Sequence, residues 1–374
     1  MNVIILNWRD IHHPLAGGAE QSLLQHAKYW QSKGASITWV VSHFSNAKKE
    51  EIVDGMRIIR MGSHYTVHLR AFFYFKRYLE KDTDIVIDSF HFIPYFSSFY
   101  ISKSKIIALI NEPGKNAWFK NSFFPINVTG YFLEQFFFLF YKGIQFITSA
   151  NSIAAELTAY GIFQKNIHII PHGITIVGKK LYKKENTETI LFLSQLTEDK
   201  GIEDALQAFS LLKPGKKHVR LWVVGKEISK DYGDSLKKMT KKLDVEKNVE
   251  FFGFVSEKKK WELLSKSWIL VHPSIREGWG LNILEANSCG TPAVGYNVTG
   301  LRDSIQDMKT GLLTKNNTPS DLVMKIELLL GNKNLYKKLS KNAILWSKRF
   351  EWIKAGKQSW QLIKMVHEKN KSKR

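Results

Sequence analysis

The sequence predicts an α/β protein of two domains, each with a mainly parallel sheet covered by helices. The chain has 374 residues, which is more than one domain usually holds. Short apolar runs alternate with amphipathic segments in the first half of the chain and again in the second half. A polar, lysine-rich run without periodicity, Gly178–Glu188, lies between the two alternations. We therefore expect the domain boundary close to this run.

The first half begins with a buried strand at Val3–Leu6, a continuous apolar run. A loop with histidines and glycines follows, and then an amphipathic helix at Ala19–Lys33 that ends at Gly34. Further strands are expected at Ile37–Val41, Met56–Met61, Asp84–Ile87, Ile106–Ile110 and Ile144–Thr148. Helices are expected at Tyr131–Tyr141 and Asn151–Tyr160. We interpret the first of these, which is rich in phenylalanine, as a core helix, and a membrane-facing surface is the alternative.

The second half repeats the alternation of strands and helices. Strands are expected at Thr189–Leu193, Leu221–Gly225, Val249–Gly253, Trp268–Val271 and Pro292–Tyr296. Helices are expected at Ile202–Leu212, from Leu281 onward, at Leu301–Ser304, Pro319–Leu330 and Leu335–Lys348, and after Trp352.

The stretch His272–Val294 carries the strongest functional signal. Its glycines, Gly278 and Gly280, interrupt helical propensity, so Glu277 should lie in a loop and Glu285 in the first turns of the following helix. The free N–H groups at such a helix start favour phosphates. Two carboxylates would repel a diphosphate, so we expect them to hold hydroxyl groups while N–H groups and a cation hold the phosphates. A nucleotide sugar offers both kinds of group.

The pattern Glu277-Gly-Trp-Gly-Leu-x3-Glu285-Ala-x3-Gly-x-Pro-x-Val294 resembles the signature of retaining GT-B glycosyltransferases of family 4. The resemblance implies two Rossmann-like domains that face each other across a cleft. It places an acceptor-binding domain at residues 1–172 and a nucleotide-sugar-binding domain at residues 173–350. Residues 351–374 would form a helix that crosses back to the first domain, followed by a basic tail.

The same resemblance implies a function. The chain would transfer a hexose-type sugar from a UDP- or GDP-sugar to a glycan or lipid-linked acceptor, with retention at the anomeric carbon. It would use no metal and no cofactor other than the donor itself. A sugar-nucleotide epimerase or phosphorylase of the same fold is the alternative within this fold.

The resemblance also assigns roles to residues. Lys200 and Gly201 match a Lys-Gly pair of the family, whereas Gln195 stands where the family has an arginine. Because charge-assisted hydrogen bonds are the stronger kind, stabilisation of the leaving diphosphate should fall mainly on Lys200. The implied catalytic residues are Lys200, Glu277 and His91. The implied donor-binding residues are Gly17, Gly18, Gln195, Lys200, Gly278, Gly280, Leu281, Asn282 and Glu285, with Glu285 on the ribose hydroxyls.

The composition limits which binding partners and which cellular compartment we expect. A count of 55 Lys and Arg against 34 Asp and Glu gives a net charge of +21, which favours an anionic partner. A basic nucleic-acid-binding protein is the alternative from another class, but no zinc spacing or RNA-recognition consensus is evident, so we expect no nucleic acid. An anionic membrane is a further candidate partner. The single cysteine, Cys289, excludes an internal disulfide and predicts a cytoplasmic protein, with peripheral contact at the inner membrane face left open.

Overall fold

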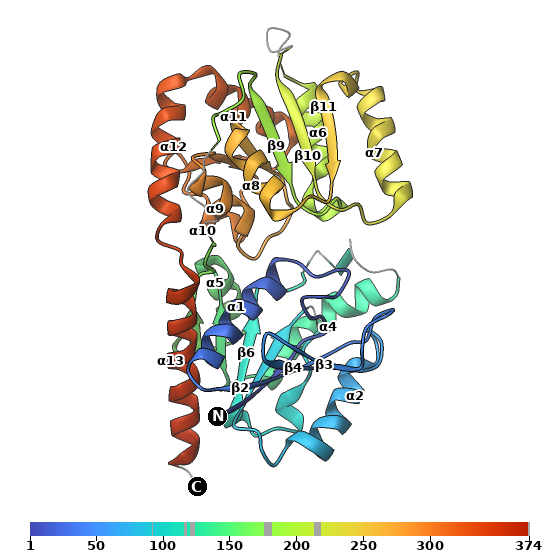
Figure 1. The fold of residues 1–374 in the computed structure, drawn as a ribbon, viewed down its shortest axis with the longest axis vertical. Helices are drawn as coiled ribbons and strands as arrows, with labels where there is room; N and C mark the ends of the chain where they lie inside the picture. The colour runs from blue at the N-terminus through green and yellow to red at the C-terminus, as the bar shows by residue number, and fades with distance from the viewer. Residues whose placement is uncertain (92, 116–117, 120–123, 176–181, 213–217, 373–374) are drawn as a thin grey trace. The chain divides into compact units, whose positions relative to one another are not determined.

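The structure is a computed structural model that describes residues 1–91, 93–115, 118–119, 124–175, 182–212 and 218–372. It contains two compact units (Figure 1). Unit 1 comprises Met1–Gly173 and Glu351–Arg374, and unit 2 comprises Ile174–Phe350. Each unit has its own sheet and its own hydrophobic core.

The sheet of unit 1 has the strand order β3-β4-β2-β1-β5-β6-β7-β8. Its neighbouring strands are parallel except for the pair β3 and β4. Every residue of β5 and β6 is buried, as expected for parallel strands covered on both faces. The strands are β1 (Asn2–Leu6), β2 (Ser36–Val41), β3 (Glu50–Val53), β4 (Met56–Arg60), β5 (Ile85–Phe90), β6 (Ile106–Ile110), β7 (Gln145–Thr148) and β8 (Ile167–Ile169).

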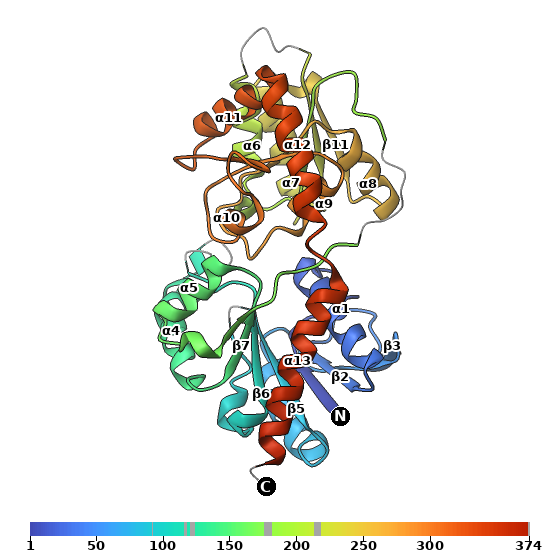
Figure 2. The same cartoon turned by 90° about the vertical axis from the view of Figure 1, so that its left-hand side faces the viewer.

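The helices of unit 1 include one from the far end of the chain. They are α1 (Gly18–Ser32), α2 (Val67–Tyr74), α4 (Ile126–Phe140), α5 (Asn151–Ala159) and α13 (Trp352–Lys371). Helix α13 lies beside α1 (Figure 2), and Ser359 Oγ accepts a hydrogen bond from Trp30 Nε1 at 2.8 Å. Gly356 lets the two helices approach, because a Cβ there would lie 2.5 Å from Tyr29. The predicted return of the last helix to the first domain is confirmed.

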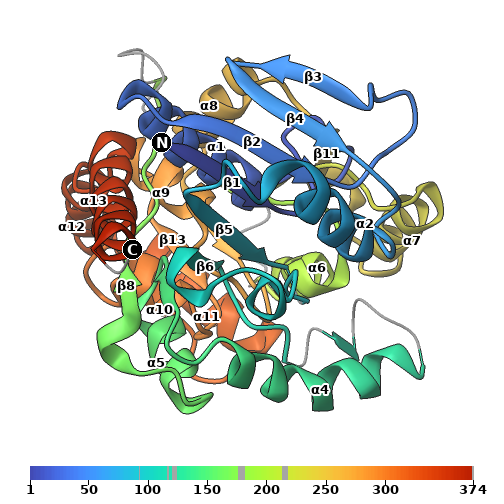
Figure 3. The same ribbon diagram turned by 90° about the horizontal axis from the view of Figure 1, so that it is seen from below.

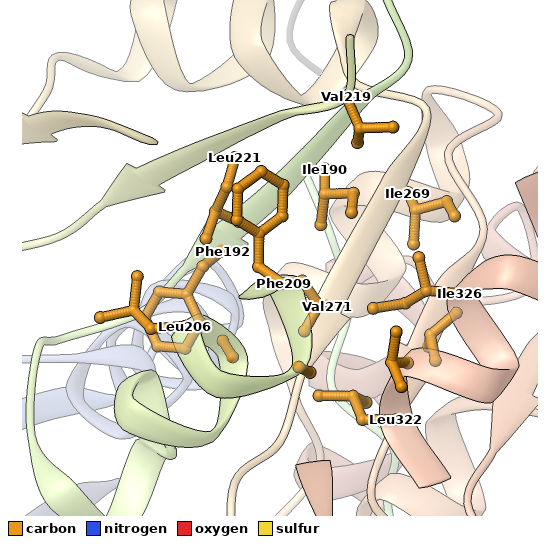
Figure 4. Close-up of a cluster of buried hydrophobic side chains, with 14 of the residues drawn as sticks. Ile190, Phe192, Leu206, Phe209, Val219, Leu221, Ile269, Val271, Leu322 and Ile326 are labelled. Atoms are coloured by element: carbon orange, nitrogen blue, oxygen red, sulfur yellow. The ribbon is translucent and has the colours of Figure 1, made fainter. Parts of the chain in front are cut away.

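Unit 2 contains a parallel sheet of order β11-β10-β9-β12-β13-β14. Its strands are β9 (Thr189–Leu193), β10 (Arg220–Val224), β11 (Val249–Gly253), β12 (Ile269–His272), β13 (Ala293–Gly295) and β14 (Gly311–Leu313). Its helices are α6 (Ile202–Ser210), α7 (Lys230–Lys242), α8 (Glu257–Lys266), α9 (Leu281–Ser288), α10 (Leu301–Ser304), α11 (Pro319–Gly331) and α12 (Lys333–Ser347). On one face of the sheet, Phe192, Val271 and Ile326 pack into a common core (Figure 4).

The structure corrects the interpretation of the phenylalanine-rich helix as a core helix. In α4, Phe138 is buried, but Phe132 and Phe136 are 56% and 50% exposed. The buried face of the helix is occupied in part by Glu134, which bonds to the preceding loop. Within the residues described, no helix is long and apolar enough to cross a membrane.

Candidate functional site

The predicted site residues lie where the order of strands reverses in each sheet. In unit 1 the chain proceeds outward from β1 through β2 and later returns to β5 on the other side of β1. In unit 2 the same reversal separates β9 from β12. Open parallel sheets bind ligands at the carboxyl ends of the strands beside such a reversal. The loop after β9 carries Lys200, and the loop after β12 carries Glu277.

In unit 2 these two loops and the last residue of β12 bring three charged or polar side chains together. Lys200 Nζ lies 3.0 Å from Glu277 Oε2, and His272 Nε2 lies 3.3 Å from the same oxygen. Burial acts to raise the pKa of Glu277, but the charge of Lys200 and the hydrogen bond from His272 outweigh it and hold the pKa well below its usual range. Glu277 is therefore an ionised carboxylate at neutral pH. The side chains of Glu277 and Lys200 are each 20% exposed, so a ligand can reach them.

The backbone holds the two loops in register. Gly201 has a φ of 72°, and a Cβ there would lie 2.2 Å from the carbonyl oxygen of Pro273. The N–H of Ile275 donates to the carbonyl of Asp199 at 3.0 Å. On the other side, a Cβ on Gly300 would lie 2.0 Å from the carbonyl oxygen of Glu277. These close approaches explain why glycine stands at both positions and fix where Lys200 and Glu277 point.

Helix α9 begins directly beside this cluster. Its N-cap is Gly280, with a φ of 82° and no side chain to cap the helix. The first N–H groups of a helix have no carbonyl of their own helix to bind, so those of Leu281 and Asn282 are available to an anion. The side chain of Asn282 is occupied, because its Nδ2 donates to the carbonyl of Leu193 and lies 3.4 Å from His272 Nδ1. The backbone N–H of Asn282 lies in the first turn of α9, where it can bind a ligand.

Two predicted donor-binding residues of unit 2, Glu285 and Gln195, lie outside the cluster of Lys200, Glu277 and His272. Glu285 lies within α9, and its Oε1 pairs with Lys260 of α8 at 2.9 Å. Burial raises the pKa of Glu285 even beside that lysine. Gln195 is exposed in the loop after β9. Its backbone is approached by Gly225, where a Cβ would lie 3.5 Å from Gln195 Cα.

Unit 1 contains a second cluster of carboxylate, cation and imidazole. Glu20 Oε1 lies 3.1 Å from Arg9 Nε and 3.1 Å from His91 Nε2, and Arg9 Nη2 lies 2.8 Å from the same His91 nitrogen. Glu20 Oε2 accepts the N–H of Gly17 at 2.8 Å. Burial acts to raise the pKa of Glu20, but His91, Arg9 and the Gly17 N–H lower it to about 2. Burial lowers the pKa of His91, and so does the charge of Arg9.

The structure thus separates the predicted residues into two groups. Lys200, Glu277, Gly278, Gly280 and Leu281 surround one helix start in unit 2, together with the backbone of Asn282. Gly17, Gly18 and His91 lie at the reversal point of unit 1. The sequence reasoning assigned no role to His272, Gly300, Arg9 or Glu20. Glu20 could have been found, since a glutamate three residues after a helix N-cap is a capping signal.

Comparison with known families gives two matches that lie one after the other. The model of the family described as Glycosyltransferase Family 4 matches residues 16–176, and that of Glycosyl transferases group 1 matches residues 175–346. An uncharacterized glycosyltransferase of Methanocaldococcus jannaschii is 29% identical over 183 residues, which are 46% of this chain and 47% of that protein. A D-inositol 3-phosphate glycosyltransferase of Streptomyces bingchenggensis is 36% identical over 87 residues, 23% of this chain and 19% of that protein. The chain spans about half the length, or less, of these curated relatives.

Solved structures resemble the whole chain. Sucrose-phosphate synthase from Thermosynechococcus elongatus superposes with a TM-score of 0.81 at 18% identity, covering 98% of each chain. Anabaena HepE in complex with UDP and glucose superposes with a TM-score of 0.73 at 18% identity, covering 98% of this chain and 100% of that one. WaaG, a glycosyltransferase involved in lipopolysaccharide biosynthesis, gives a TM-score of 0.75 at 17% identity over 96% and 99% of the two chains. At these identities the likeness establishes the fold, which is of the GT-B type.

Proposed function

The chain belongs to the group 1 glycosyltransferases of family 4, and we propose that it transfers a hexose-type sugar from a UDP- or GDP-sugar to a hydroxyl group of its acceptor. Transfer retains the anomeric configuration and needs no metal. The observation that carries the proposal is the cluster of Lys200, Glu277 and His272 beside the uncapped start of α9. The relative HepE, whose structure holds UDP and glucose, supports a nucleotide-sugar donor.

The geometry suits the two halves of such a donor. The ammonium of Lys200 and the N–H groups of Leu281 and Asn282 bind the diphosphate, and they stabilise the negative charge that develops on it as the bond to the sugar breaks. Glu277 accepts hydrogen bonds from hydroxyl groups of the sugar, and His272 keeps its carboxylate oriented. The acceptor hydroxyl attacks the anomeric carbon and passes its proton to the departing phosphate oxygen, so no covalent enzyme intermediate is needed.

Glu285 and the residues of unit 1 complete the proposal. Glu285 binds the ribose hydroxyls with the oxygen that Lys260 leaves open, and Gln195 donates to the diphosphate as a neutral amide. Gly17 and Gly18 approach the donor phosphates, and His91 contacts the reacting sugar. Unit 1 binds the acceptor, a glycan or a lipid-linked glycan at the cytoplasmic face of an anionic membrane. The net charge of +21 supports an anionic surface of this kind.

The test is donor binding and turnover with a charge-matched control. Calorimetry against a panel of UDP- and GDP-sugars should detect one donor, and Lys200→Ala should lower the transfer rate by about 10²- to 10³-fold, the usual effect of losing one transition-state donor. Lys259→Ala removes an ammonium of the same unit that pairs with Glu262 on the same helix, and it should leave the rate unchanged. EDTA should have no effect, and the product should keep the anomeric configuration of the donor. Unchanged turnover in Lys200→Ala would overturn the assignment, and donor conversion without acceptor would indicate an epimerase or phosphorylase.

A further inference from the structure

Helix α4 has its faces reversed relative to an ordinary surface helix. Its only charged side chain, Glu134, is 2% exposed and points inward. There its carboxylate accepts hydrogen bonds from the backbone N–H of Lys115 at 2.7 Å and from Trp118 Nε1 at 2.8 Å. Most outward side chains of its second half are apolar, with Gln135 as the polar exception: Phe132 is 56% exposed and Phe136 is 50% exposed. A helix on the surface of a water-soluble domain normally shows its polar face to water.

The exposed apolar surface extends beyond the helix. The ring of Phe99, which is 64% exposed, lies 4.6 Å from that of Phe140. The ring of Phe119, 48% exposed, lies 5.3 Å from that of Tyr131. Helix α4 lies at the rim of unit 1 (Figures 1 and 3). We call the following residues, each at least 38% exposed, the aromatic face: Phe99, Phe119, Tyr131, Phe132, Leu133, Phe136, Leu139 and Phe140.

The size and continuity of this face indicate an interaction surface. Single exposed apolar side chains are normal in soluble proteins, but a contiguous group of eight is not. The face contains no acidic side chain, because the carboxylate of Glu134 is turned inward. An exposed lysine, Lys142, stands two residues after the end of α4.

The charge distinguishes between the partners that could cover the face. Two copies of a chain with a net charge of +21 repel each other. An anionic phospholipid leaflet attracts a chain of this charge and the exposed Lys142 after α4, at a gain of about 1 kcal/mol per basic residue near the surface. Aromatic side chains are the ones enriched where protein meets the boundary between headgroups and acyl chains. With 15 residues, α4 is too short to span a bilayer but suits a helix lying in its plane.

We infer that the aromatic face docks unit 1 on an anionic membrane, with α4 parallel to the surface and Phe132 and Phe136 inserted among the acyl chains. This inference rests on the proposed function in one respect only, since it explains how the chain would reach a membrane-borne acceptor. The docking itself requires neither donor nor turnover. It can therefore fail or succeed independently of the glycosyl transfer proposed above.

Vesicle binding tests the inference. The full chain should sediment with vesicles of phosphatidylglycerol and phosphatidylcholine, and less with phosphatidylcholine alone. The double variant Phe132→Gln/Phe136→Gln should lower the partition coefficient at least about tenfold, because burying each phenyl ring in apolar surroundings is favourable by more than a factor of ten. The matched control is Leu345→Gln/Ile353→Gln, which makes the same kind of change at residues 56% and 71% exposed on α12 and α13. The control should bind like the unmodified chain.

A labelled cysteine locates the contact. The only native cysteine, Cys289, is buried, so Phe136→Cys can be labelled selectively with an environment-sensitive dye. Its emission should shift to shorter wavelength on addition of anionic vesicles, whereas a dye on Ile353→Cys should not respond. Far-UV circular dichroism and donor calorimetry on each variant confirm that both units remain folded.

Three results would overturn the inference: no sedimentation with anionic vesicles, sedimentation that the double variant leaves unchanged, or a concentration-dependent dimer in ultracentrifugation that the double variant abolishes. The last result would assign the face to a second copy of the chain. Docking without any donor binding would instead contradict the proposed function and leave the aromatic face assigned to the membrane.

Discussion

The two units use the same three kinds of side chain at their strand-order reversals, but they arrange them differently. Unit 1 has Glu20 with Arg9 and His91, and unit 2 has Glu277 with Lys200 and His272. Glu20 is fully buried and accepts the N–H of Gly17, so the carboxylate closes the start of its own helix, α1. Glu277 stands in a loop three residues before Gly280, and the start of α9 carries no side-chain cap.

The difference indicates what each cluster is for. A helix start that its own carboxylate has neutralised offers little to an anionic ligand, whereas an uncapped start beside an ammonium attracts one. We therefore expect the cluster of unit 1 to stabilise the fold and position His91, and we propose that the cluster of unit 2 binds the donor. The glycines Gly17 and Gly18 remain predicted donor contacts, but the N–H of Gly17 is already used by Glu20.

Replacing Glu20 or Glu277 by alanine should give the largest difference between the two units. Glu20→Ala leaves the guanidinium of Arg9, 15% exposed, without its carboxylate, and this should lower the free energy of unfolding by about 3 kcal/mol or more. Glu277→Ala should cost less stability, because Lys200 keeps a second carboxylate, Asp199, at 3.9 Å, but it should abolish transfer. Hydrogen exchange followed by mass spectrometry reports each unit separately. Equal loss of protection in both variants would show that the two clusters have the same structural role.

Strands could be predicted from the sequence where they are short, continuous runs of apolar residues. The strands Ile106–Ile110 and Thr189–Leu193 were predicted with the bounds that the structure has, because each is a buried apolar run bordered by polar segments. Helix α2 was missed although Val67 and Ala71 are buried one turn apart on it, because Leu69 and Phe73 are apolar but exposed and so mask the contrast between its two faces. Strand β14 has three residues, too few for a pattern.

The sequence indicated which residues belong to the site, but not which of them contact each other. Lys200 and Glu277 are 77 positions apart, and only the order of strands brings the loops after β9 and β12 together. The orientation of α4 was unpredictable for a similar reason. Glu134 faces inward because the loop before the helix, at Lys115 and Trp118, supplies donors for its carboxylate. A pattern along one helix cannot show partners that lie elsewhere in the chain.

A second prediction is that the stability of unit 1 decreases at acidic pH. Burial in the contact between α1 and α13, with His172 nearby, lowers the pKa of His26 to about 3. The unfolded chain binds a proton at this imidazole below about pH 6.5 and the folded chain does not, so stability falls as the pH drops through this window. Between about pH 6.5 and about pH 5 the loss from His26 should reach about 2 kcal/mol.

The variant His26→Asn tests this cause. An asparagine amide can replace the Nδ1 contact to Ser359 Oγ, which is 2.9 Å long, and it does not titrate. Urea unfolding of the variant should show the pH dependence reduced by about 2 kcal/mol over the same window. An unchanged slope would mean that other groups cause the acid sensitivity of unit 1.

The smallest predicted effect concerns a buried ammonium of unit 2. Lys184 Nζ donates to the carbonyl of Ser267 at 2.7 Å and to Thr291 Oγ1, and burial lowers the pKa of Lys184 to about 7. Because the folded pKa lies below the unfolded value of about 10.4, the cost to stability is full below about pH 7 and disappears as the pH rises toward about 10.4. Thr291 Oγ1 also donates to the carbonyl of Leu264, so removing the lysine leaves that hydroxyl bonded.

Lys184→Met should therefore stabilise unit 2 by about 1–2 kcal/mol at about pH 7, as replacing a buried charge by an apolar side chain often does. The gain should shrink toward about pH 10, where the lysine is neutral in the folded chain and nearly so in the unfolded one. Lys183→Met, at the exposed neighbour, makes the same substitution without removing a buried charge and should change stability little. A loss of stability in Lys184→Met would show that the hydrogen bonds of this ammonium outweigh its burial. Unit 2 would then resemble unit 1, where the buried cation Arg9 stabilises the fold through its carboxylate partner.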